Sequence, residues 1–231
     1  MTALEKSRVL KVYGDSANGL YDEFMMDYVH RLHPASRIAY KSLFRILSSH
    51  LEKTSGGSAL EVGVGTGRNL HRYPENISFV GVDITPEMLN EAEKRAGTLG
   101  RKNARFYVKD AENLEFESNS FDVVVSTYTI CVTSNPARVM EEMIKVAKPG
   151  GLIGIYDCKK ANHNSDLLFD QEFLADTIRT AGLYYKGRPV VVYNLLSDLD
   201  TLVSESGLKP IDKAILEFSC EESLGMYILQ K

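Results

Sequence analysis

The sequence predicts an α/β fold: a mostly parallel sheet with helices on both of its faces. Between residues 58 and 156, apolar runs alternate with segments of helical periodicity, which is typical of repeated strand–helix units. Several of these runs end in a glycine or an acid, the position at which ligands bind in open parallel sheets. The 231 residues, of which 44% are hydrophobic, suffice for one α/β domain with a single core.

The first predicted strand, Ala59–Val62, leads into a glycine-rich turn. Gly63, Gly65 and Gly67 follow at alternate positions, before a predicted helix. Glycines permit positive φ and let a ligand approach main-chain N–H groups. The G-x-G-x-G spacing differs from the G-x-G-x-x-G of dinucleotide folds, and Glu61 would repel a phosphate but attract an ammonium group. The turn therefore predicts a nucleoside cofactor other than NAD, or else a tight connection without a ligand.

The second predicted strand, Phe79–Ile84, contains an acid at its end. Asp83 lies 22 positions after Glu61, and such a carboxylate can accept both hydroxyls of a ribose, although a solvated acid is the alternative. Thr85 is the predicted N-cap of the next helix, and Pro86 is its first residue.

The third predicted strand lies within Phe106–Glu112 and ends at Asp110, beside the small residue Ala111. Asp110 could accept a hydrogen bond from an exocyclic amine such as adenine N6. The elements that follow are a strand at Phe121–Thr127, a helix at Pro136–Val146 capped by Asn135, a strand at Leu152–Tyr156 after the turn Lys148–Gly151, and last strands at Ile211–Phe218 and Met226–Leu229.

Two segments lie outside this core. Residues 1–57 contain a helical stretch from Pro34 to Leu51 whose apolar stripe we expect to pack on the sheet, although it could line a substrate cleft or touch a membrane. Residues 158–207 are inserted after the fifth strand, where they could form a lid over the crevice. We therefore expect one domain, composed of an N-terminal helical cap and substrate-side segment at 1–57 and a cofactor-binding core at 58–231.

Together these motifs resemble the class I S-adenosylmethionine-dependent methyltransferases. Glu61–Gly67 resembles the first motif of that family, Val82–Asp83 the second and Asp110–Ala111 the third, whereas Phe121–Val124 and Lys148–Gly151 resemble later ones. The resemblance covers roughly residues 58–156. It is strongest to the branch of ubiquinone/menaquinone C-methyltransferases and bacterial phospholipid N-methyltransferases, because Asn69–Leu70 and Tyr73–Pro74 follow the glycine turn.

The resemblance implies a Rossmann-like sheet of seven strands with an antiparallel last strand, and S-adenosylmethionine as cofactor. It places Gly63 and Gly65 near the aminoacyl arm and Glu61 near its ammonium group, directly or through water. The remaining cofactor-binding residues that it implies are Gly67 in the turn, Asp83 at the ribose, Ile84 and Met88 at the adenine face, Asp110 and Ala111 at the adenine edge, Thr127 at the methionine moiety, and Tyr21, in competition with Tyr13, closing over the ligand.

Catalytic residues are harder to predict from the sequence. The candidates are Tyr128, Asp157 and His163, and Tyr184 or Tyr185 could contact a cationic amine product. His30 and His33 have no evident third ligand, and the three cysteines have no zinc spacing, so we expect no metal. A mechanism by proximity alone is then the default.

We expect a methyltransferase for a small molecule or a lipid headgroup, with N-methylation slightly favoured. The alternatives are a quinone-precursor C-methyltransferase, a tailoring enzyme of secondary metabolism, and a catalytically silent cofactor-binding subunit. The net charge of −4, with interspersed charges, argues against general binding to nucleic acid. The charged N-terminus and the absence of long apolar runs predict a cytoplasmic protein, with peripheral membrane contact through Arg37, Lys41 and Arg45 as an option.

Overall fold

A computed structural model describes residues 3–31, 33–160, 183–186, 188–191, 198–217 and 223–231. Its elements are α1 (Ala3–Ser16), α2 (Leu20–Arg31), α3 (Pro34–Lys53), β1 (Ser58–Val62), the 3₁₀ turn η1 (Leu70–Arg72), β2 (Ser78–Asp83), α4 (Pro86–Thr98), β3 (Ala104–Val108), β4 (Phe121–Thr127), the 3₁₀ turn η2 (Ile130–Val132), α5 (Pro136–Val146), β5 (Ala147–Cys158), β6 (Leu183–Tyr185), β7 (Arg188–Val191), α7 (Leu199–Glu205), β8 (Pro210–Glu217) and β9 (Ser223–Gln230).

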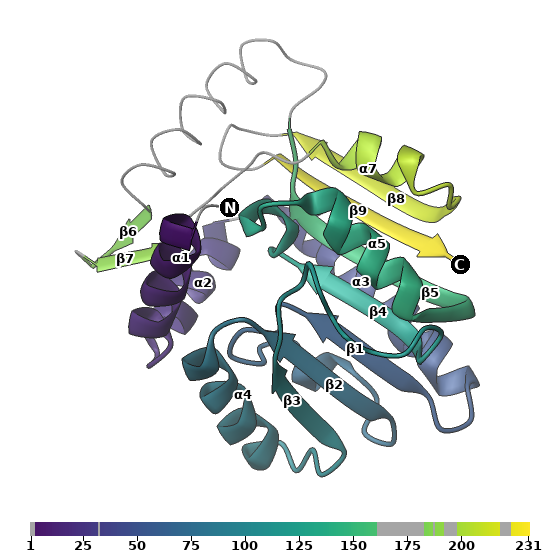
Figure 1. Ribbon diagram of the computed structural model, residues 1–231, viewed down its shortest axis with the longest axis horizontal. Coiled ribbons are helices and arrows are strands. Elements are labelled where there is room, and N and C mark those ends of the chain that lie inside the picture. Colours follow the sequence, from purple (N-terminus) through teal and green to yellow (C-terminus); the bar gives the residue numbers. More distant parts are fainter. Residues whose placement is uncertain (1–2, 32, 161–182, 187, 192–197, 218–222) are drawn as a thin grey trace.

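Seven strands form one sheet in the order β3-β2-β1-β4-β5-β9-β8 (Figure 1). Strands β1 to β5 pair in parallel, whereas β9 runs antiparallel between β5 and β8. Every residue of β4 is buried, which is typical of a central parallel strand covered on both faces. The predicted mostly parallel, seven-stranded sheet with an antiparallel last strand is confirmed.

Helices cover both faces of the sheet, and each buries an apolar stripe. On one face Leu43 and Leu47 of α3 are fully buried, and Leu89 of α4 belongs to the same cluster. On the other face the apolar side of α5, with Val139 and Met143, packs together with residues of α7. The stripe from Pro34 to Leu51 therefore packs on the sheet, which is the first of the roles that the sequence predicts for it.

The helix predicted directly after the glycine turn is absent. Only the three-residue η1 follows β1, and no helix connects β3 to β4, so strand–helix alternation is less regular than the sequence predicts. The η1 turn ends at Arg72. The next residue, Tyr73, is extended, because Pro74 disfavours a helical conformation of the residue before it. Arg101 then holds this connection as a loop by donating hydrogen bonds to the carbonyl oxygens of Leu70, Tyr73 and Pro74 (2.6, 2.5 and 2.7 Å).

Helices α1 and α2 lie beside the carboxyl ends of the strands, where α1 contacts α4 and the β6–β7 hairpin (Figure 1). In that hairpin the Lys186 ammonium forms an ion pair with Glu23 of α2 at 2.6 Å. Part of the inserted segment 158–207 thus lies against the N-terminal helices, and its residues 161–182, 187 and 192–197 lie outside the described chain. No helix in the described part of the chain has the length and apolarity needed to cross a bilayer.

Candidate active site

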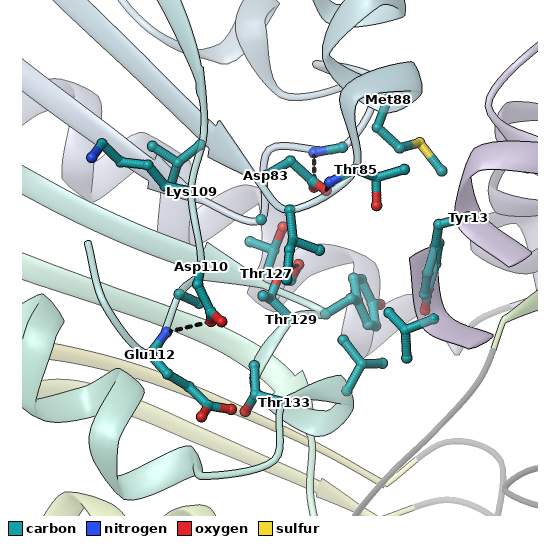
Figure 2. Close-up of a pocket in the computed structure, with 18 of the residues that line it drawn as sticks. Tyr13, Asp83, Thr85, Met88, Lys109, Asp110, Glu112, Thr127, Thr129 and Thr133 are labelled. Atoms are coloured by element: carbon teal, nitrogen blue, oxygen red, sulfur yellow. Dashed lines mark hydrogen bonds between the residues drawn. The ribbon is translucent and has the colours of Figure 1, made fainter. Parts of the chain in front are cut away.

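A cavity of about 220 Å³ opens at the carboxyl ends of β1 to β4 (Figure 2). The predicted site residues that line it are Tyr21, Gly63, Gly65, Asp83, Ile84, Met88, Asp110, Ala111, Thr127 and Tyr128. The other lining residues are Val9, Tyr13, Val82, Thr85, Lys109, Glu112, Thr129, Val132, Thr133 and Ser134. The structure therefore brings together residues that are far apart in the sequence, whereas Glu61, Gly67 and Asp157 do not line the cavity.

Each of the three positions in the turn requires glycine for a different structural reason. All have positive φ: +72° at Gly63, +52° at Gly65 and +75° at Gly67. A Cβ at Gly63 would lie 2.0 Å from Oγ1 of Thr129, and one at Gly67 would lie 3.2 Å from Ala92 of α4, so both glycines permit close packing. A Cβ at Gly65 would meet nothing within 4 Å, and this residue lines the cavity. Gly65 therefore leaves open the space that a ligand would fill.

Asp83 joins the glycine turn to the start of α4. One carboxylate oxygen accepts a hydrogen bond from the Gly65 N–H at 3.0 Å, and the other accepts one from the Thr85 N–H at 2.9 Å (Figure 2). Burial raises the pKa of Asp83, whereas these backbone N–H groups lower it. Each oxygen keeps a further lone pair, so the carboxylate can also accept hydroxyl groups of a ligand.

Asp110 and Glu112 form the opposite wall. The Asp110 carboxylate accepts a hydrogen bond from the Glu112 N–H at 2.9 Å, which fixes the turn after β3. The Glu112 carboxylate accepts from the N–H groups of Ser134 and Asn135 (2.8 and 3.1 Å) and so ties this turn to the start of α5. The Lys109 side chain is directed away from the other labelled residues in Figure 2, and its ammonium pairs with Glu115 at 3.2 Å.

Glu61 lies beneath the cavity and is 1% exposed. Its carboxylate accepts hydrogen bonds from the Asn69 amide (2.7 Å) and from the Tyr73 hydroxyl (3.0 Å). Burial raises the pKa of Glu61 to about 7, against the opposing effects of these hydrogen bonds and of the Arg72 charge. Glu61 does not line the cavity, but Asn69 links it to the cavity wall, because the same Asn69 amide also donates to Thr127 Oγ1 at 3.3 Å.

Tyr128 has φ +53°, a left-handed conformation that is strained for a residue with a side chain. Its N–H donates to the Tyr156 carbonyl at 2.9 Å, and its ring packs edge-on against the Tyr156 ring at 5.4 Å. Burial raises the pKa of Tyr128 well above its usual range. Tyr128 is therefore protonated near neutral pH, and its hydroxyl is not a base there.

Tyr13 of α1 and Tyr21 of α2 both line the cavity, with their rings edge-on at 5.9 Å, so the two candidates share this wall. The neighbouring Asp22 holds α2 in place. Its carboxylate forms an ion pair with Arg95 of α4 and accepts a hydrogen bond from the Thr66 hydroxyl at 2.6 Å. Asp22 thus fastens the N-terminal helices to the glycine turn, a role that no local sequence pattern signals.

Asp157, a catalytic candidate from the sequence, is fully buried, and its carboxylate binds backbone N–H groups. Its carboxylate accepts hydrogen bonds from the N–H groups of Thr129, Ile130 and Cys158 at 2.9, 2.7 and 2.8 Å. Its position outside the cavity favours a structural role, in which it shapes the loop that carries Thr129.

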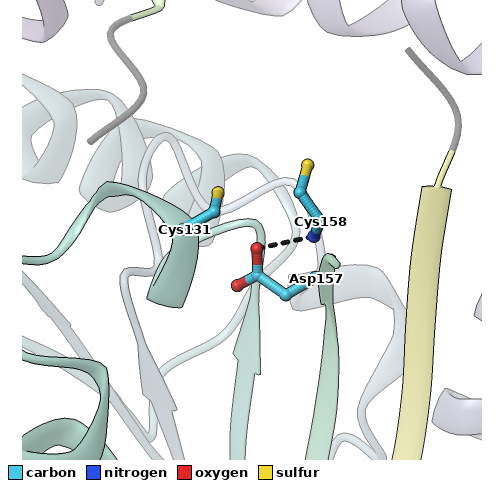
Figure 3. A group of neighbouring side chains, drawn as sticks. All are labelled: Cys131, Asp157 and Cys158. Carbon is cyan, nitrogen blue, oxygen red and sulfur yellow. Dashed lines mark hydrogen bonds between the residues drawn. The ribbon is translucent and has the colours of Figure 1, made fainter. Parts of the chain in front are cut away.

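Asp157 lies between two buried cysteines, Cys131 and Cys158 (Figure 3). Potential metal-ligating atoms of the three residues lie within 4.8 Å of one another. Because the Asp157 carboxylate already accepts hydrogen bonds from three backbone N–H groups, we interpret the cluster as part of the structure of this loop rather than as a metal site. His163 lies outside the described residues, as do the side chains of His30, Tyr184 and Tyr185, whereas His33 Nδ1 accepts from the Ala35 N–H at the start of α3.

The cavity combines hydrogen-bond acceptors with aromatic and apolar surface. Three carboxylates (Asp83, Asp110 and Glu112) and three tyrosine rings (Tyr13, Tyr21 and Tyr128) line it, together with apolar side chains such as Met88. No histidine or cysteine of the described chain lines it. This wall can bind a ligand that donates hydrogen bonds and carries positive charge, because carboxylates and aromatic faces both attract cations.

Comparison with known proteins supports the same interpretation. The model of a methyltransferase domain family matches residues 53–206. The chain is similar to a phosphatidylethanolamine N-methyltransferase of Cereibacter sphaeroides, with 37% identity over 43% of this chain and 50% of that protein. It is also similar to a thiol S-methyltransferase of Rattus norvegicus, with 32% identity over 60% of this chain and 59% of that protein. The chain thus spans about half to three fifths of the length of these relatives.

Among solved structures, the N-methyltransferase NodS of Bradyrhizobium japonicum, in complex with S-adenosylhomocysteine, superposes with a TM-score of 0.60. The sequence identity is 14%, and the match covers 87% of this chain and 89% of that one. At this identity the likeness shows the fold. From the family match and the sheet order, the chain belongs to the methyltransferase domain family and has the fold of the class I S-adenosylmethionine-dependent methyltransferases.

Proposed function

We propose that this chain is an S-adenosylmethionine-dependent methyltransferase whose acceptor is a small molecule or a lipid headgroup, with an amine nitrogen as the favoured acceptor atom. The cavity at the strand ends carries the proposal, because acids and tyrosine rings line it together with the open glycine turn. The similarity to a protein named phosphatidylethanolamine N-methyltransferase favours nitrogen and a lipid headgroup.

The residues present fit the cofactor. The open space beside Gly65 would admit the ligand close to the main chain, and Asp83 would accept the ribose hydroxyls there. Asp110 would accept the adenine amine, and Met88 would pack against the adenine face. Glu61, beneath the turn, would contribute its charge through Asn69.

The bound cofactor supplies a methyl group on a positively charged sulfonium. The chain itself binds, orients and excludes water, which are the main contributions to an in-line displacement. Desolvation raises the pKa values of Tyr21 and Tyr128, so both hydroxyls stay protonated near neutral pH and would donate hydrogen bonds to a ligand rather than take its proton. An amine acceptor in its neutral form needs no base for the displacement, because its proton leaves afterwards. The aromatic and acidic wall would favour the cationic product.

A thiol is the second candidate acceptor, because one relative is named a thiol S-methyltransferase. A thiol reacts as its thiolate and would need a group that takes its proton. The described cavity wall offers carboxylates for this purpose but no histidine. Because an amine needs no base and a thiol does, we favour nitrogen over sulfur as the acceptor atom.

The proposal is tested by incubating the purified chain with methyl-labelled S-adenosylmethionine and separate acceptors. The acceptors are ethanolamine and its phosphate ester, vesicles containing phosphatidylethanolamine, aliphatic and aromatic thiols, and quinone precursors. We expect transfer to an amine. Methyl transfer only to thiols, or only to carbon atoms of quinone precursors, would show that the acceptor is not an amine and would support the corresponding alternative.

Asp83→Asn serves as the control for the cofactor site. It should lower cofactor affinity by about 1–3 kcal/mol, because the amide loses the charge-assisted hydrogen bonds to the ribose. Cofactor binding that depends on Asp83, without transfer to any acceptor, would identify a catalytically silent subunit.

A further inference from the structure

A second cavity, of about 130 Å³, lies beside the first and shares Tyr128 with it. It is formed by α2, α3 and the loop after the glycine turn, not by the strand ends that form the first cavity. Its lining residues are Met25, Arg37, Tyr40, Lys41, Arg68, Asn69, His71, Arg72 and Tyr128.

The wall of this second cavity is strongly cationic. Three arginines and a lysine line it, and no acid of the described chain does. Arg68 is compensated by Asp22, whose carboxylate lies 3.6 Å from its guanidinium. Lys41, by contrast, forms no ion pair within the described residues. The Arg72 guanidinium lies over the rings of Tyr40 and Phe44, and its charge also acts on the buried Glu61.

Two further observations concern Arg72 and His71, in the loop that forms one side of this wall. The Nε of Arg72 is buried and has no hydrogen-bond partner among the described residues, which is costly for a donor in a protein interior. Burial, together with the positive charges of Arg72, Arg95 and Arg68, lowers the pKa of His71. The loop therefore has a surplus of positive charge that an anion would neutralise.

The second cavity is connected to the first through hydrogen bonds. The Tyr40 hydroxyl donates to Oδ1 of the Asn69 side chain at 2.7 Å, and Nδ2 of the same side chain donates to Thr127, which lines the first cavity. A cationic wall so close to a positively charged methyl donor would weaken the binding of that donor. An anionic group between them would remove this repulsion.

On this basis, and resting on the proposed methyltransferase function, we propose that the second cavity binds the anionic group, a phosphate or a carboxylate, of the methyl acceptor. The acceptor would then place its anion against α3 and the Arg68–Arg72 loop and extend past Tyr128 to the methyl donor. Lys41 supplies a charge that pairs with no described carboxylate, Arg72 supplies its buried Nε–H, and Arg37 widens the cationic wall. This assigns a specificity site for anionic acceptors such as phosphorylated amines.

The test is calorimetric titration of inorganic phosphate into the full chain at low salt, with S-adenosylhomocysteine at saturation. The variant is Arg37→Gln together with Lys41→Gln. Both side chains reach solvent from α3, so the fold should persist. Arg45→Gln together with Lys53→Gln is the matched control, because it removes the same charge from exposed positions of α3 outside the cavity.

We expect phosphate to bind with S-adenosylhomocysteine present, to lose about ten-fold or more in affinity in the cavity variant, and to bind normally in the control. Tighter binding of phosphoethanolamine than of inorganic phosphate would identify a headgroup, and equal binding would identify the phosphate alone. Equal losses in both variants, or no phosphate binding, would overturn the proposal. A second titration omits S-adenosylhomocysteine. Phosphate binding seen only in that titration would also overturn the proposal, since the cavity would then hold the carboxylate of the cofactor.

These outcomes do not depend on methyl transfer. Methyl transfer to neutral amines without phosphate binding would support the proposed function and contradict the anion site. Phosphate binding without methyl transfer to any acceptor would support an anion site and contradict the proposed function.

Discussion

Glu61 is buried below the cavity among Asn69, Tyr73 and the Arg72 charge. Its place near the cofactor ammonium, directly or through water, stays a prediction. Because this buried carboxyl has a raised pKa, the stability of the folded protein should depend on whether Glu61 is protonated.

Glu61→Gln should change how stability depends on pH. The folded protein holds the Glu61 proton up to about pH 7, whereas the unfolded chain releases it near 4.5. The stability contributed by this proton is present below pH 4.5 and is lost as the pH rises through 7, a change of about 3 kcal/mol. We therefore expect the glutamine variant to gain stability relative to the wild type between pH 5 and pH 8. Urea denaturation of both cofactor-free proteins measures this gain, and parallel pH profiles would contradict it.

Gly65→Ala separates backbone strain from ligand space. Both Gly65 and Gly100 have positive φ, and a Cβ at either position would meet nothing within 4 Å, but only Gly65 lines the cavity. Alanine at either position should cost about 1–2 kcal/mol of stability, because a left-handed conformation is strained for L-residues.

Only the Gly65 variant should also bind S-adenosylhomocysteine about ten-fold more weakly or worse, since its methyl group would enter the cavity. Calorimetry on the two variants is the measurement. Equal affinities would show that the ligand does not approach Gly65.

Helix α7 illustrates how an element of the inserted segment is fastened to the sheet. Its Asp200 carboxylate pairs with Lys159, whose side chain is fully buried at the end of β5 (3.1 Å), and with Lys213 of β8 (2.5 Å). Asp200 also accepts a hydrogen bond from the Tyr227 hydroxyl at 2.9 Å. Despite partial burial, which acts in the opposite direction, these partners hold the pKa of Asp200 at about 2.

Asp200→Asn should therefore destabilise the protein, because the buried Lys159 ammonium loses the attraction of the Asp200 charge. We expect a loss of about 2–3 kcal/mol, below the value for a fully buried pair, because the Asp200 side chain is 29% exposed. Asp15→Asn, which breaks an exposed pair with Lys11, should cost less than about 1 kcal/mol. Urea denaturation compares the two variants, and equal losses would refute the buried-charge argument.

At the scale of the whole molecule, helices α1 and α2 at the start of the chain form one wall of the cavity. Tyr13 and Tyr21 reach the strand ends because Asp22 fastens α2 to the glycine turn and to α4. A ligand in the cavity would thus contact both the sheet and the N-terminal helices, and its binding should stabilise both.

S-adenosylhomocysteine at about 100 times its dissociation constant should stabilise the folded chain by about 2.7 kcal/mol. For a chain of 231 residues this corresponds to a rise in Tm of about 5–10 °C. NAD at the same concentration should leave the Tm unchanged. A thermal unfolding series checks this, and equal shifts with both ligands would show that the site does not discriminate between them.

The sequence determined the local features of this protein. Strand β4, helix α5 with its Asn135 cap, the glycine turn and the acids at the ends of β2 and β3 follow from periodicity, glycine spacing and cap residues, which act within a few positions of the chain. Those strand ends also predict a cavity where Gly63, Asp83, Asp110 and Thr127 now lie together, because parallel strands end at one edge of the sheet.

Only the tertiary structure decided what lies beneath and around that cavity. The burial of Glu61, the clamp from Asp22 to α4, the missing helix after the glycine turn and the cationic second cavity all depend on contacts between distant residues, such as Arg101 with the loop at Leu70. Local propensity carries no information about such contacts, because burial and charge pairing arise only when the chain has packed.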